Sequence, residues 1–526
     1  MKLLLTQEMS EADSRTINSG ISGVFLMRRA GEQVANVVEE LGRGPHTVIS
    51  FAGPGNNGGD AIIAALLLGQ RGYHVKLLML TECRTLKGDA RHMAELYKAS
   101  GLPLHENISN WPASELANHL DPGATLIDGL LGAGLDRPLQ PPLSNIVIEM
   151  NKHNGPIIAV DVPTGVNGNS GCAMAQNNTV IKATKTVTFF RPKPGHYLMP
   201  GRELCGELQV RDIGIPKRVL DQIAPKTELN SPGIWQKAAN AAARKVQRSS
   251  AHKYDNGACL VIGGDDTMLG AATLSSNAAL RGGAGLVTVA INRPDHPPAK
   301  LFSTVMTTKR PGADGVNEII QNRKISAALI GPGCLPDEET RALVTSLMSL
   351  DIALVLDAGA LSAFKDQSGE FIKALKQRSN QQTILTPHEG EFKKLSKGGS
   401  DHKENREGVS LGQNDEKMPE GKLAAAQRAA TETGAVVILK GTDTVIAAPD
   451  GRAAINNNAP ATLATAGTGD VLAGMVLAAL ARGYKAYEAA ARAVYLHGAV
   501  AAHIGHTLVA DDIIDSIPIV EADLAI

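Results

Sequence analysis

The sequence predicts an α/β protein built from two large domains, on three observations. At 526 residues the chain exceeds what a single hydrophobic core usually holds. Short apolar runs alternate with longer helical patterns, as is typical of parallel sheets covered by helices. Hydrophobic residues make up 43% of the chain, charged residues 20% and aromatic residues only 3%, with 54 glycines. This composition fits globular α/β domains rich in Ala, Val, Ile and Leu.

The first half of the chain contains five short apolar runs that we expect to form strands. They cover residues 48–52, 75–80, 126–127, 157–160 and 187–190, and the pattern of a helix follows the first run at 61–71. Three of the runs end in residues that can carry chemistry, at Gly53, Asp128 and Asp161. Because the carboxyl ends of parallel strands meet at one edge of a sheet, these residues are expected to face one crevice.

The strand pattern lapses between residues 216 and 250, where the sequence is polar and alanine-rich and contains Pro225 and Pro232. A domain boundary is therefore predicted near residue 225, which gives domains 1–225 and 226–526. A second series of predicted strands follows at 259–262, 286–290, 327–330, 354–356, 383–385 and 436–439, with helical stretches such as 271–280 between them. The glycine motifs of the two halves differ in order and spacing, which favours a fusion of unlike domains over a duplication.

One segment of the second half, residues 393–422, is rich in Lys, Glu, Asp, Asn, Ser and Gly and has few large apolar residues. Because such a segment buries little surface, it is predicted to be a mobile surface insertion.

Charge and cysteine content argue against several classes of protein. The formal net charge is −1, and no basic stripe is interleaved with aromatic residues, so nucleic acid is not an expected partner. The five cysteines lack CxxC spacing, which fits reduced thiols better than disulfides or a zinc site. The apolar run at residues 3–5 is too short for a signal peptide, and the longest apolar runs elsewhere, at 61–68 and 471–481, fall well short of a bilayer span, so the expectation is a cytoplasmic protein without a membrane partner. A homo-oligomer is the default expectation for such an enzyme.

The clearest chemical motif of the second half is the turn 466–470, Ala-Gly-Thr-Gly-Asp, directly before an apolar helix that starts at Val471. Glycines before a helix allow backbone N–H groups to turn toward an anion, and the helix dipole adds positive potential there. Asp470 at this anion site could take a proton from an attacking hydroxyl. The alternative interpretation is a capping Asp beside a tight turn.

Four histidines of the second half are candidate ligands, three near the C-terminus and one in the middle. His497, His503 and His506 lack partner acids at metal spacing and are interpreted as structural. His388 alone would be a strand-end histidine satisfied by the backbone, but it belongs to the sequence Thr-Pro-His-Glu-Gly-Glu at 386–391. That context favours a contact with substrate.

The first half carries the octapeptide Gly-Pro-Gly-Asn-Asn-Gly-Gly-Asp at 53–60, between a predicted strand and a predicted helix. Such a loop can cradle phosphate, but it lacks the GxGxxG fingerprint and the Walker Lys-Ser/Thr. Oxygen atoms of Asn57, Asp128 and Thr164 would suit a hard cation. Each acid taken singly could cap a helix or steady a turn, whereas three strand ends beside glycines favour a site.

Residues from about 251 to 516 resemble the ribokinase-like superfamily. More specifically, Gly331-Pro332-Gly333, Asp357-Ala358, the 386–391 sequence, Lys440-Gly441-Thr442 and the Gly467 turn resemble NAD(P)H-hydrate dehydratases. The resemblance implies that the nucleotide is held by Lys440, Gly441, Thr442, Asp443, Thr444 and Gly469. It also implies that the hydrated nicotinamide is lined by Ala271, Gly333, His388 and Asp470. Two departures are His252-Lys253-Tyr254 in place of the usual His-Lys-Gly, and the polar insertion.

This resemblance implies a coupled chemistry in the C-terminal domain. A phosphoryl group would pass to the hydroxyl of the hydrated ring, with Asp470 as acid/base residue and Mg²⁺ neutralising the phosphates. Loss of the resulting phosphate would restore the ring double bond. Resemblance to bacterial-type bifunctional enzymes favours ADP as the co-substrate, which would give AMP and phosphate, whereas the motifs alone leave ADP and ATP open.

Residues from about 5 to 215 resemble the NAD(P)H-hydrate epimerase domain, with the octapeptide as the most specific part. The resemblance implies substrate contacts by Asn56, Asn57, Gly58, Gly59, Asp60, Gly132, Ala133, Gly134, Leu135, Asp136, Arg137, Pro138 and Asp161. It implies a potassium ion (K⁺) bound by Asn57, Asp128 and Thr164, where the family commonly has Ser in place of Thr164. Asp161 is expected to be the general acid/base residue, while the chemical route of inversion stays open.

The two resemblances together imply a Rossmann-like N-terminal domain and a ribokinase-like C-terminal domain, each a three-layer αβα fold. The expected function is repair of hydrated NADH and NADPH, with the first domain interconverting the R and S forms and the second dehydrating the S form. One alternative is a small-molecule kinase of the vitamin-kinase kind with an N-terminal ligand-binding module. Another treats the N-terminal half as a sensing or protein-binding module.

Overall fold

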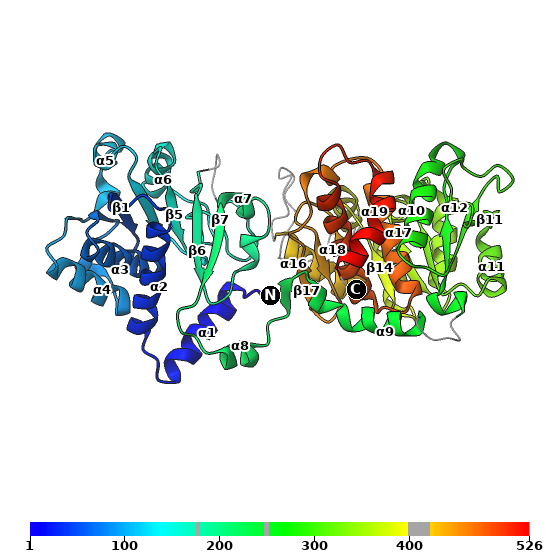
Figure 1. Cartoon of the computed structure of the whole chain (residues 1–526), viewed down its shortest axis with the longest axis horizontal. Helices are drawn as coiled ribbons and strands as arrows, with labels where there is room; N and C mark the ends of the chain where they lie inside the picture. Colours follow the sequence, from blue (N-terminus) through cyan, green and yellow to red (C-terminus); the bar gives the residue numbers. More distant parts are fainter. Residues whose placement is uncertain (175–178, 247–251, 398–420, 525–526) are drawn as a thin grey trace, which may run out of the picture. The chain divides into compact units, whose positions relative to one another are not determined.

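The computed structural model describes residues 1–174, 179–246, 252–397 and 421–524 (Figure 1). The chain divides into two compact units. The N-terminal unit is Lys2–Thr227, and the C-terminal unit is Glu228–Ile526 together with Met1. Both are mixed α/β structures, as the sequence predicts.

The N-terminal unit is built on a seven-stranded sheet whose order is β3-β2-β1-β4-β5-β6-β7, with all of its neighbouring strands parallel. The strands are β1 (Thr47–Ala52), β2 (His74–Met79), β3 (Leu104–His105), β4 (Thr125–Gly129), β5 (Ile157–Val160), β6 (Lys185–Phe189) and β7 (Glu207–Arg211). The helices are α1 (Thr6–Asn18), α2 (Gly23–Glu39), α3 (Asn56–Gln70), α4 (Gly88–Ala99), α5 (Ala113–His119), α6 (Leu143–Lys152), α7 (Gly201–Leu204) and α8 (Lys217–Ile223).

Helices cover both faces of this sheet, as strand β1 demonstrates (Figure 1). Val48 and Ala52 belong to a hydrophobic cluster with residues of α2, α3 and α4. Ile49 and Phe51, which alternate with them, belong to a second cluster with residues of α5 and α6. Since successive side chains of a strand point to opposite faces, the unit has the three layers of an αβα fold.

The C-terminal unit is built on a ten-stranded sheet whose order is β11-β10-β9-β12-β13-β14-β15-β16-β17-β8. Its strands are β8 (Thr227–Leu229), β9 (Ala258–Ile262), β10 (Leu286–Ile291), β11 (Met306–Lys309), β12 (Ala327–Ile330), β13 (Ala353–Leu356), β14 (Thr383–Leu385), β15 (Val436–Leu439), β16 (Val445–Ala447) and β17 (Ala453–Ile455). The pairs from β11 to β15 are parallel, and β16 pairs antiparallel with β15 and β17.

The helices of this unit are α9 (Gln236–Val246), α10 (Leu269–Arg281), α11 (Val316–Asn322), α12 (Glu338–Met348), α13 (Ala358–Ser362), α14 (Ser368–Lys376), α15 (Glu389–Lys397), α16 (Lys422–Thr433), α17 (Thr468–Ala481), α18 (Ala486–Ile504) and α19 (Ala510–Asp523). Helix α17 is apolar almost all round and buries most of its residues, as expected for a helix inside the core. It packs against α10 and α18 in one large hydrophobic cluster.

Most predicted strands agree with the structure, and β5, β12, β14 and β15 have the predicted bounds. The sequence reading missed the short β3, β8, β16 and β17 and the partly exposed β7 and β11. The sequence predicts no strand in residues 216–250. This prediction is wrong, because β8 lies there, at the edge of the second sheet.

Two further predictions need correction. Helix α3 begins at Asn56 instead of residue 61, so the second half of the glycine octapeptide is helical rather than loop. The predicted insertion 393–422 is also too long, since residues 393–397 belong to α15 and Lys422 is the buried first residue of α16. Residues 398–420 lie outside the described part of the chain.

All five cysteines are free. Within the described residues, none of the helices combines the length and the apolar character needed to cross a membrane.

Candidate active sites

The glycines of the 53–60 octapeptide are required where strand β1 passes into helix α3. A Cβ atom on Gly53 would lie 1.8 Å from the carbonyl oxygen of Leu130, and one on Gly58 would lie 1.9 Å from the carbonyl oxygen of Gly53. Both distances are far below a van der Waals contact. Gly55, the N-cap of α3, has open space around it. The turn therefore brings the first residues of α3 tightly against the end of β4.

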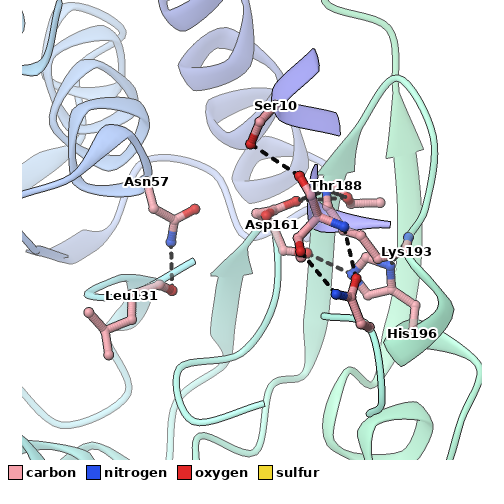
Figure 2. Close-up of polar contacts among 9 residues, drawn as sticks. Ser10, Asn57, Leu131, Asp161, Thr188, Lys193 and His196 are labelled. Atoms are coloured by element: carbon pink, nitrogen blue, oxygen red, sulfur yellow. Dashed lines mark hydrogen bonds and ion pairs between the residues drawn. The ribbon is translucent and has the colours of Figure 1, made fainter. Parts of the chain in front are cut away.

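The three residues expected at a cation surround the backbone of Leu131. Thr164 donates from its hydroxyl and from its backbone N–H to the Asp128 carboxylate, at 2.7 and 2.8 Å. The Asn57 side chain donates to the carbonyl oxygen of Leu131 at 3.0 Å (Figure 2). The N–H of Leu131 donates to the Thr164 hydroxyl at 3.0 Å. Carboxylate, hydroxyl and carbonyl oxygens thus gather at one place, beside the side-chain amide of Asn57.

Asp128 is completely buried, and burial raises the pKa of its carboxyl to about 6. Its hydrogen bonds come from Thr164 and from the backbone of Leu130. Among the described residues it has no ion-pair partner. A buried carboxylate without a counter-charge is costly, so this oxygen set fits a bound cation.

Asp161 follows β5 directly, and its φ of 65° lies in the left-handed region. Its carboxylate accepts a hydrogen bond from Thr188 at 3.0 Å and pairs closely with the ammonium of Lys193 (Figure 2). Burial alone would raise the pKa of Asp161, but Lys193 holds it below its usual value. Asp161 is therefore ionised at neutral pH and can accept a proton.

His196 fixes the backbone beside Asp161. Its Nδ1 accepts from the N–H of Lys193 at 2.9 Å, so Nε2 carries the proton that it donates to the carbonyl oxygen of Asp161 at 2.8 Å. Burial lowers the pKa of His196 to about 4, so the ring is neutral. This contact holds Asp161 in its left-handed conformation.

Of these groups, Asn57, Leu131, Asp161 and Lys193 line a cavity of about 560 Å³ at the carboxyl edge of the sheet. Of the residues predicted to contact substrate, those lining the cavity are Asn56, Asn57, Asp60, Gly132, Ala133, Gly134, Leu135, Asp136, Arg137 and Asp161. Gly58 and Gly59 are buried in the first turn of α3, and Pro138 is exposed beside the cavity. Asp13 of α1 and Lys193 also line it. The sequence reading missed both, because neither belongs to a glycine motif.

The second site lies where three neighbouring strands of the C-terminal sheet end. Asp357 follows β13, His388 lies shortly after β14, and Lys440 follows β15. The Lys440 ammonium lies 2.9 Å from the carboxylate of Asp357, which is buried. His388 pairs with Lys440 as an isolated parallel bridge. The strand order thus brings these residues together across 83 residues of chain.

The Gly467 turn ends close to this ammonium. Gly467 has a φ of 85°, which favours glycine, and caps α17. A Cβ on Gly469 would lie 3.5 Å from the Nζ of Lys440. The free N–H groups of the helix start and the ammonium therefore meet at one point. Their combined positive potential fits a phosphate group.

Asp470 lies in the first turn of α17, next to that point. Burial raises the pKa of its carboxyl to about 6, with additional repulsion from Asp357 and Glu391 and an opposing effect of Lys440. The carbonyl oxygen of Asp470 accepts a hydrogen bond from Ser275 of α10 at 3.0 Å. A carboxyl with this pKa is suited to exchange a proton near neutral pH.

The loop 440–444 is held by Lys422, which the sequence reading placed in the polar insertion. The Lys422 ammonium lies 2.6 Å from the Asp443 carboxylate and donates to the carbonyl oxygen of Lys440 at 3.2 Å. The Thr444 hydroxyl donates to the carbonyl oxygen of Gly441 at 2.7 Å. The Asp443 side chain is therefore held by Lys422, and internal hydrogen bonds fix the shape of the loop.

The remaining predicted contacts lie in two groups. His388 is largely exposed, and its ring lies 3.5 Å from the Glu391 carboxylate. Gly333 has a φ of 70°, and a Cβ there would lie 2.6 Å from the carbonyl oxygen of Met268, just before the helix that carries Ala271. The described contacts join this second group to Asp470 through the packing of α10 on α17.

His497, interpreted from sequence as structural, is buried in α18 beside the backbone of Thr468. Burial lowers the pKa of its ring to about 4. It packs behind the Gly467 turn.

Two parallel-sheet α/β units, each with an acidic side chain and a glycine turn at its strand ends, define a two-domain α/β enzyme. Residues 24–195 match the model of the YjeF-related protein N-terminus, and residues 259–518 match that of NAD(P)H-hydrate dehydratase. Each match falls within one unit.

Relatives match the chain over nearly its whole length. The bifunctional NAD(P)H-hydrate repair enzyme of Thermofilum pendens is 32% identical over 511 residues, which is 95% of this chain and 91% of the relative. That of Moorella thermoacetica is 32% identical over 545 residues, with 100% and 97% covered. The chain belongs to the family of bifunctional NAD(P)H-hydrate repair enzymes. Among solved structures, an ADP/ATP-dependent NAD(P)H-hydrate dehydratase from Bacillus subtilis, co-crystallised with ATP/Mg²⁺, is 28% identical and covers 53% of this chain and 93% of its own, with a TM-score of 0.41.

Proposed function

We propose that this protein repairs hydrated NADH and NADPH with two active sites on one chain. The N-terminal unit, Lys2–Thr227, interconverts the R and S hydrates, and the C-terminal unit, Glu228–Ile526, dehydrates the S form with an adenine nucleotide. The observation that best supports this proposal is that single-chain relatives named for this repair match both units of the protein. A vitamin kinase with a separate ligand-binding module is not favoured, because it gives no reason for the paired match.

In the N-terminal unit, Asp161 is the proposed general acid/base residue. The close pair with Lys193 keeps its carboxylate charged, and His196 holds its backbone. The cavity beside it offers a loop of small residues after β4 and the start of α3 to a dinucleotide. Asp161 would take or return a proton at the carbinol group of the hydrated ring.

Potassium is the proposed ion at Asn57, Asp128 and Thr164. The uncompensated buried carboxylate of Asp128 and the neighbouring neutral oxygens fit a monovalent cation. A bound cation would supply a fixed positive charge beside the cavity.

In the C-terminal unit, the proposed reaction begins with proton transfer from the hydroxyl of the hydrated ring to Asp470. The oxygen then attacks the terminal phosphorus of the nucleotide, and the bond from this phosphorus to the bridging oxygen breaks. Lys440 and the N–H groups of the Gly467 turn would stabilise the charge on the transferring group. The phosphate then leaves the ring carbon with the electron pair of the C–O bond, the adjacent carbon loses a proton to solvent, and the double bond returns.

ADP is the proposed phosphoryl donor, and Mg²⁺ its counter-ion. The phosphate oxygens of the nucleotide would provide the oxygen ligands that Mg²⁺ prefers, beside the ammonium of Lys440. When bound, the metal would neutralise charge on the phosphates.

The function is tested by incubating the protein with a mixture of R and S hydrates, Mg²⁺, K⁺ and either ADP or ATP, and following the absorbance of the reduced nicotinamide. Full recovery of both epimers requires both sites. Recovery of only the S form would remove the epimerase assignment. If neither nucleotide supports recovery, the repair function is wrong.

A cytoplasmic location and a homo-oligomeric state stay predictions. Light scattering of the purified protein would test the second.

A further inference from the structure

Asp161 is not the only carboxyl side chain that lines the cavity of the N-terminal unit. Asp13 comes from α1, Asp60 from the second turn of α3, and Asp161 from the position directly after β5. All three line the same cavity, together with a single lysine, Lys193. Asp89 and Asp136 line it as well, so the carboxyl groups along this cavity outnumber its one ammonium.

The Lys193 ammonium already has two partners. Lys193 pairs with the Asp161 carboxylate and donates to the Thr188 hydroxyl at 3.1 Å, and its side chain is only 3% exposed. The Asp60 carboxyl has neither a hydrogen-bond partner nor an ion-pair partner among the described residues. Since unpaired charge is costly in such a space, Asp60 is the group that is easiest to protonate.

The surrounding charges agree with this assignment. Burial, then the charges of Asp161 and Asp13, raise the pKa of Asp60 well above its usual value, and Lys193 opposes them. Burial also raises the pKa of Asp13 to about 6. The other charged side chains along the cavity are Asp89 of α4 and Asp136 and Arg137 of the loop after β4, while His196 is neutral. Two carboxyls with opposite protonation states are the usual sign of an acid and base pair.

We propose that Asp60 is the proton donor of the epimerisation, paired with Asp161 as proton acceptor, and that Asp13 keeps Asp60 protonated. This inference rests on the proposed function of the N-terminal site. Asp60 would give its proton to the hydroxyl oxygen of the carbinol carbon. The C–O bond breaks with its electron pair on oxygen, water leaves, and the lone pair of the ring nitrogen forms a C=N bond.

Return of water completes the inversion. A water molecule adds its oxygen to the other face of the carbon, the C=N electron pair returns to nitrogen, and Asp161 takes the surplus proton. Asp161 then loses that proton to solvent, and Asp60 regains one from it. No net proton is gained or lost, and no co-reactant is needed.

The test uses full-length protein in which Asp470→Asn prevents consumption of the hydrates, with K⁺ present. One purified epimer is supplied, and formation of the other is followed by chromatography after subtraction of the uncatalysed rate. Adding Asp60→Asn is expected to lower kcat at least about 100-fold, as loss of a general acid does. KM should change less than about threefold, because the amide keeps the size and polarity of the side chain. Asp60→Glu should restore part of kcat.

The pH profile separates proton donation from a positioning role. The rate should fall at high pH as Asp60 loses its proton. Asp13→Asn removes a negative charge near Asp60 and should move this alkaline limb to lower pH by about half a unit or more. Thermal unfolding checks that each variant is folded.

Several results would overturn the proposal. These are a wild-type kcat in Asp60→Asn, an effect confined to KM, or an alkaline limb that Asp13→Asn leaves in place. If Asp60→Asn fails to fold, the kcat and pH profile of Asp60→Glu decide in the same way. If the reference protein itself does not epimerise, the proposed function fails instead.

Discussion

Lys440 and Asp357 form an ion pair of 2.9 Å at the ends of β15 and β13, two strands that flank β14. Burial disfavours the charged form of Lys440, but Asp357 outweighs it and raises the pKa of the ammonium. The ammonium is therefore charged at neutral pH. It lies beside Gly469 at the start of α17, where a phosphate would bind.

Replacing this lysine should impair both dehydration and stability. Lys440→Met removes the charge next to the phosphate site, so kcat/KM for dehydration should fall by about 100-fold or more. It also leaves Asp357 buried without its partner, which should lower the free energy of unfolding by about 3 kcal/mol. Nucleotide-dependent absorbance and urea unfolding measure the two effects. Lys440→Arg keeps the charge and is the matched control; dehydration within threefold of wild type in Lys440→Met would contradict the role.

Replacing Asp470 should have opposite effects on activity and on stability. Asp470→Asn removes the base and should abolish dehydration. Because burial raises the pKa of Asp470 from 3.8 to about 6, the folded state binds its proton more tightly than the unfolded state does. This residue therefore costs stability as pH rises through that window. At pH 7 the Asn variant should be more stable by up to about 3 kcal/mol.

The pH dependence gives the control for Asp470. The stability difference should shrink as pH falls from 7 toward 4, because Asp470 becomes protonated in the folded state and begins to be protonated in the unfolded state. In wild-type protein, kcat/KM for dehydration should decrease as pH falls through about 6, because the base becomes protonated. A flat profile down to pH 5 would assign the base elsewhere.

Potassium should stabilise the N-terminal unit through Asp128. K⁺ should raise the thermal midpoint of this unit and support epimerisation, whereas choline at the same ionic strength should do neither. Asp128→Asn should remove both responses, since the buried negative charge that the cation neutralises is gone. Thr164→Ser keeps the hydroxyl and should keep both responses. A potassium response unchanged in Asp128→Asn would exclude this site.

The glycine octapeptide offers a test with a close control. Gly58→Ala places a Cβ 1.9 Å from the Gly53 carbonyl oxygen, so it should destabilise the N-terminal unit by more than about 2 kcal/mol. Gly55→Ala has open space and a φ of −96°, so it should change stability by less than about 0.5 kcal/mol. Differential scanning calorimetry of both variants makes the comparison. Equal stability of the two would show that the turn relaxes.

The two proposed acid/base residues were identified from the sequence, Asp161 because it follows a strand and Asp470 because it belongs to a glycine turn before a helix. The side chains that surround these two residues and their loops were not identified from the sequence. Lys193 lies 32 residues after Asp161, and Asp13 belongs to a helix without any motif. Lys422 looked like part of a polar insertion, yet it is buried against Asp443. No local pattern marks such residues.

The bounds of the helices and strands also divide into those that the local sequence pattern predicts and those that depend on tertiary packing. Buried central strands such as β5 and β12 were predicted correctly, since their residues are apolar without interruption. β7 and β8 have mixed or very short patterns and owe their strand form to pairing at the sheets' margins. The start of α3 was placed too late, because glycine and asparagine are poor helix formers that tertiary packing overrides.

By itself, the sequence determined the alternation of strands and helices, the tight turns at Gly53 and Gly467, and the acids that follow them. These features depend on side-chain periodicity and backbone sterics over a few residues. The tertiary structure alone decided that Ser275 meets Asp470 across 195 residues, that Lys440 reaches Asp357, and that Asp161 pairs with Lys193 while Asp60 has no such partner among the described residues. Proton affinity depends on burial and on charges brought together from distant parts of the chain, so it becomes defined only when the strands take their order in the sheets.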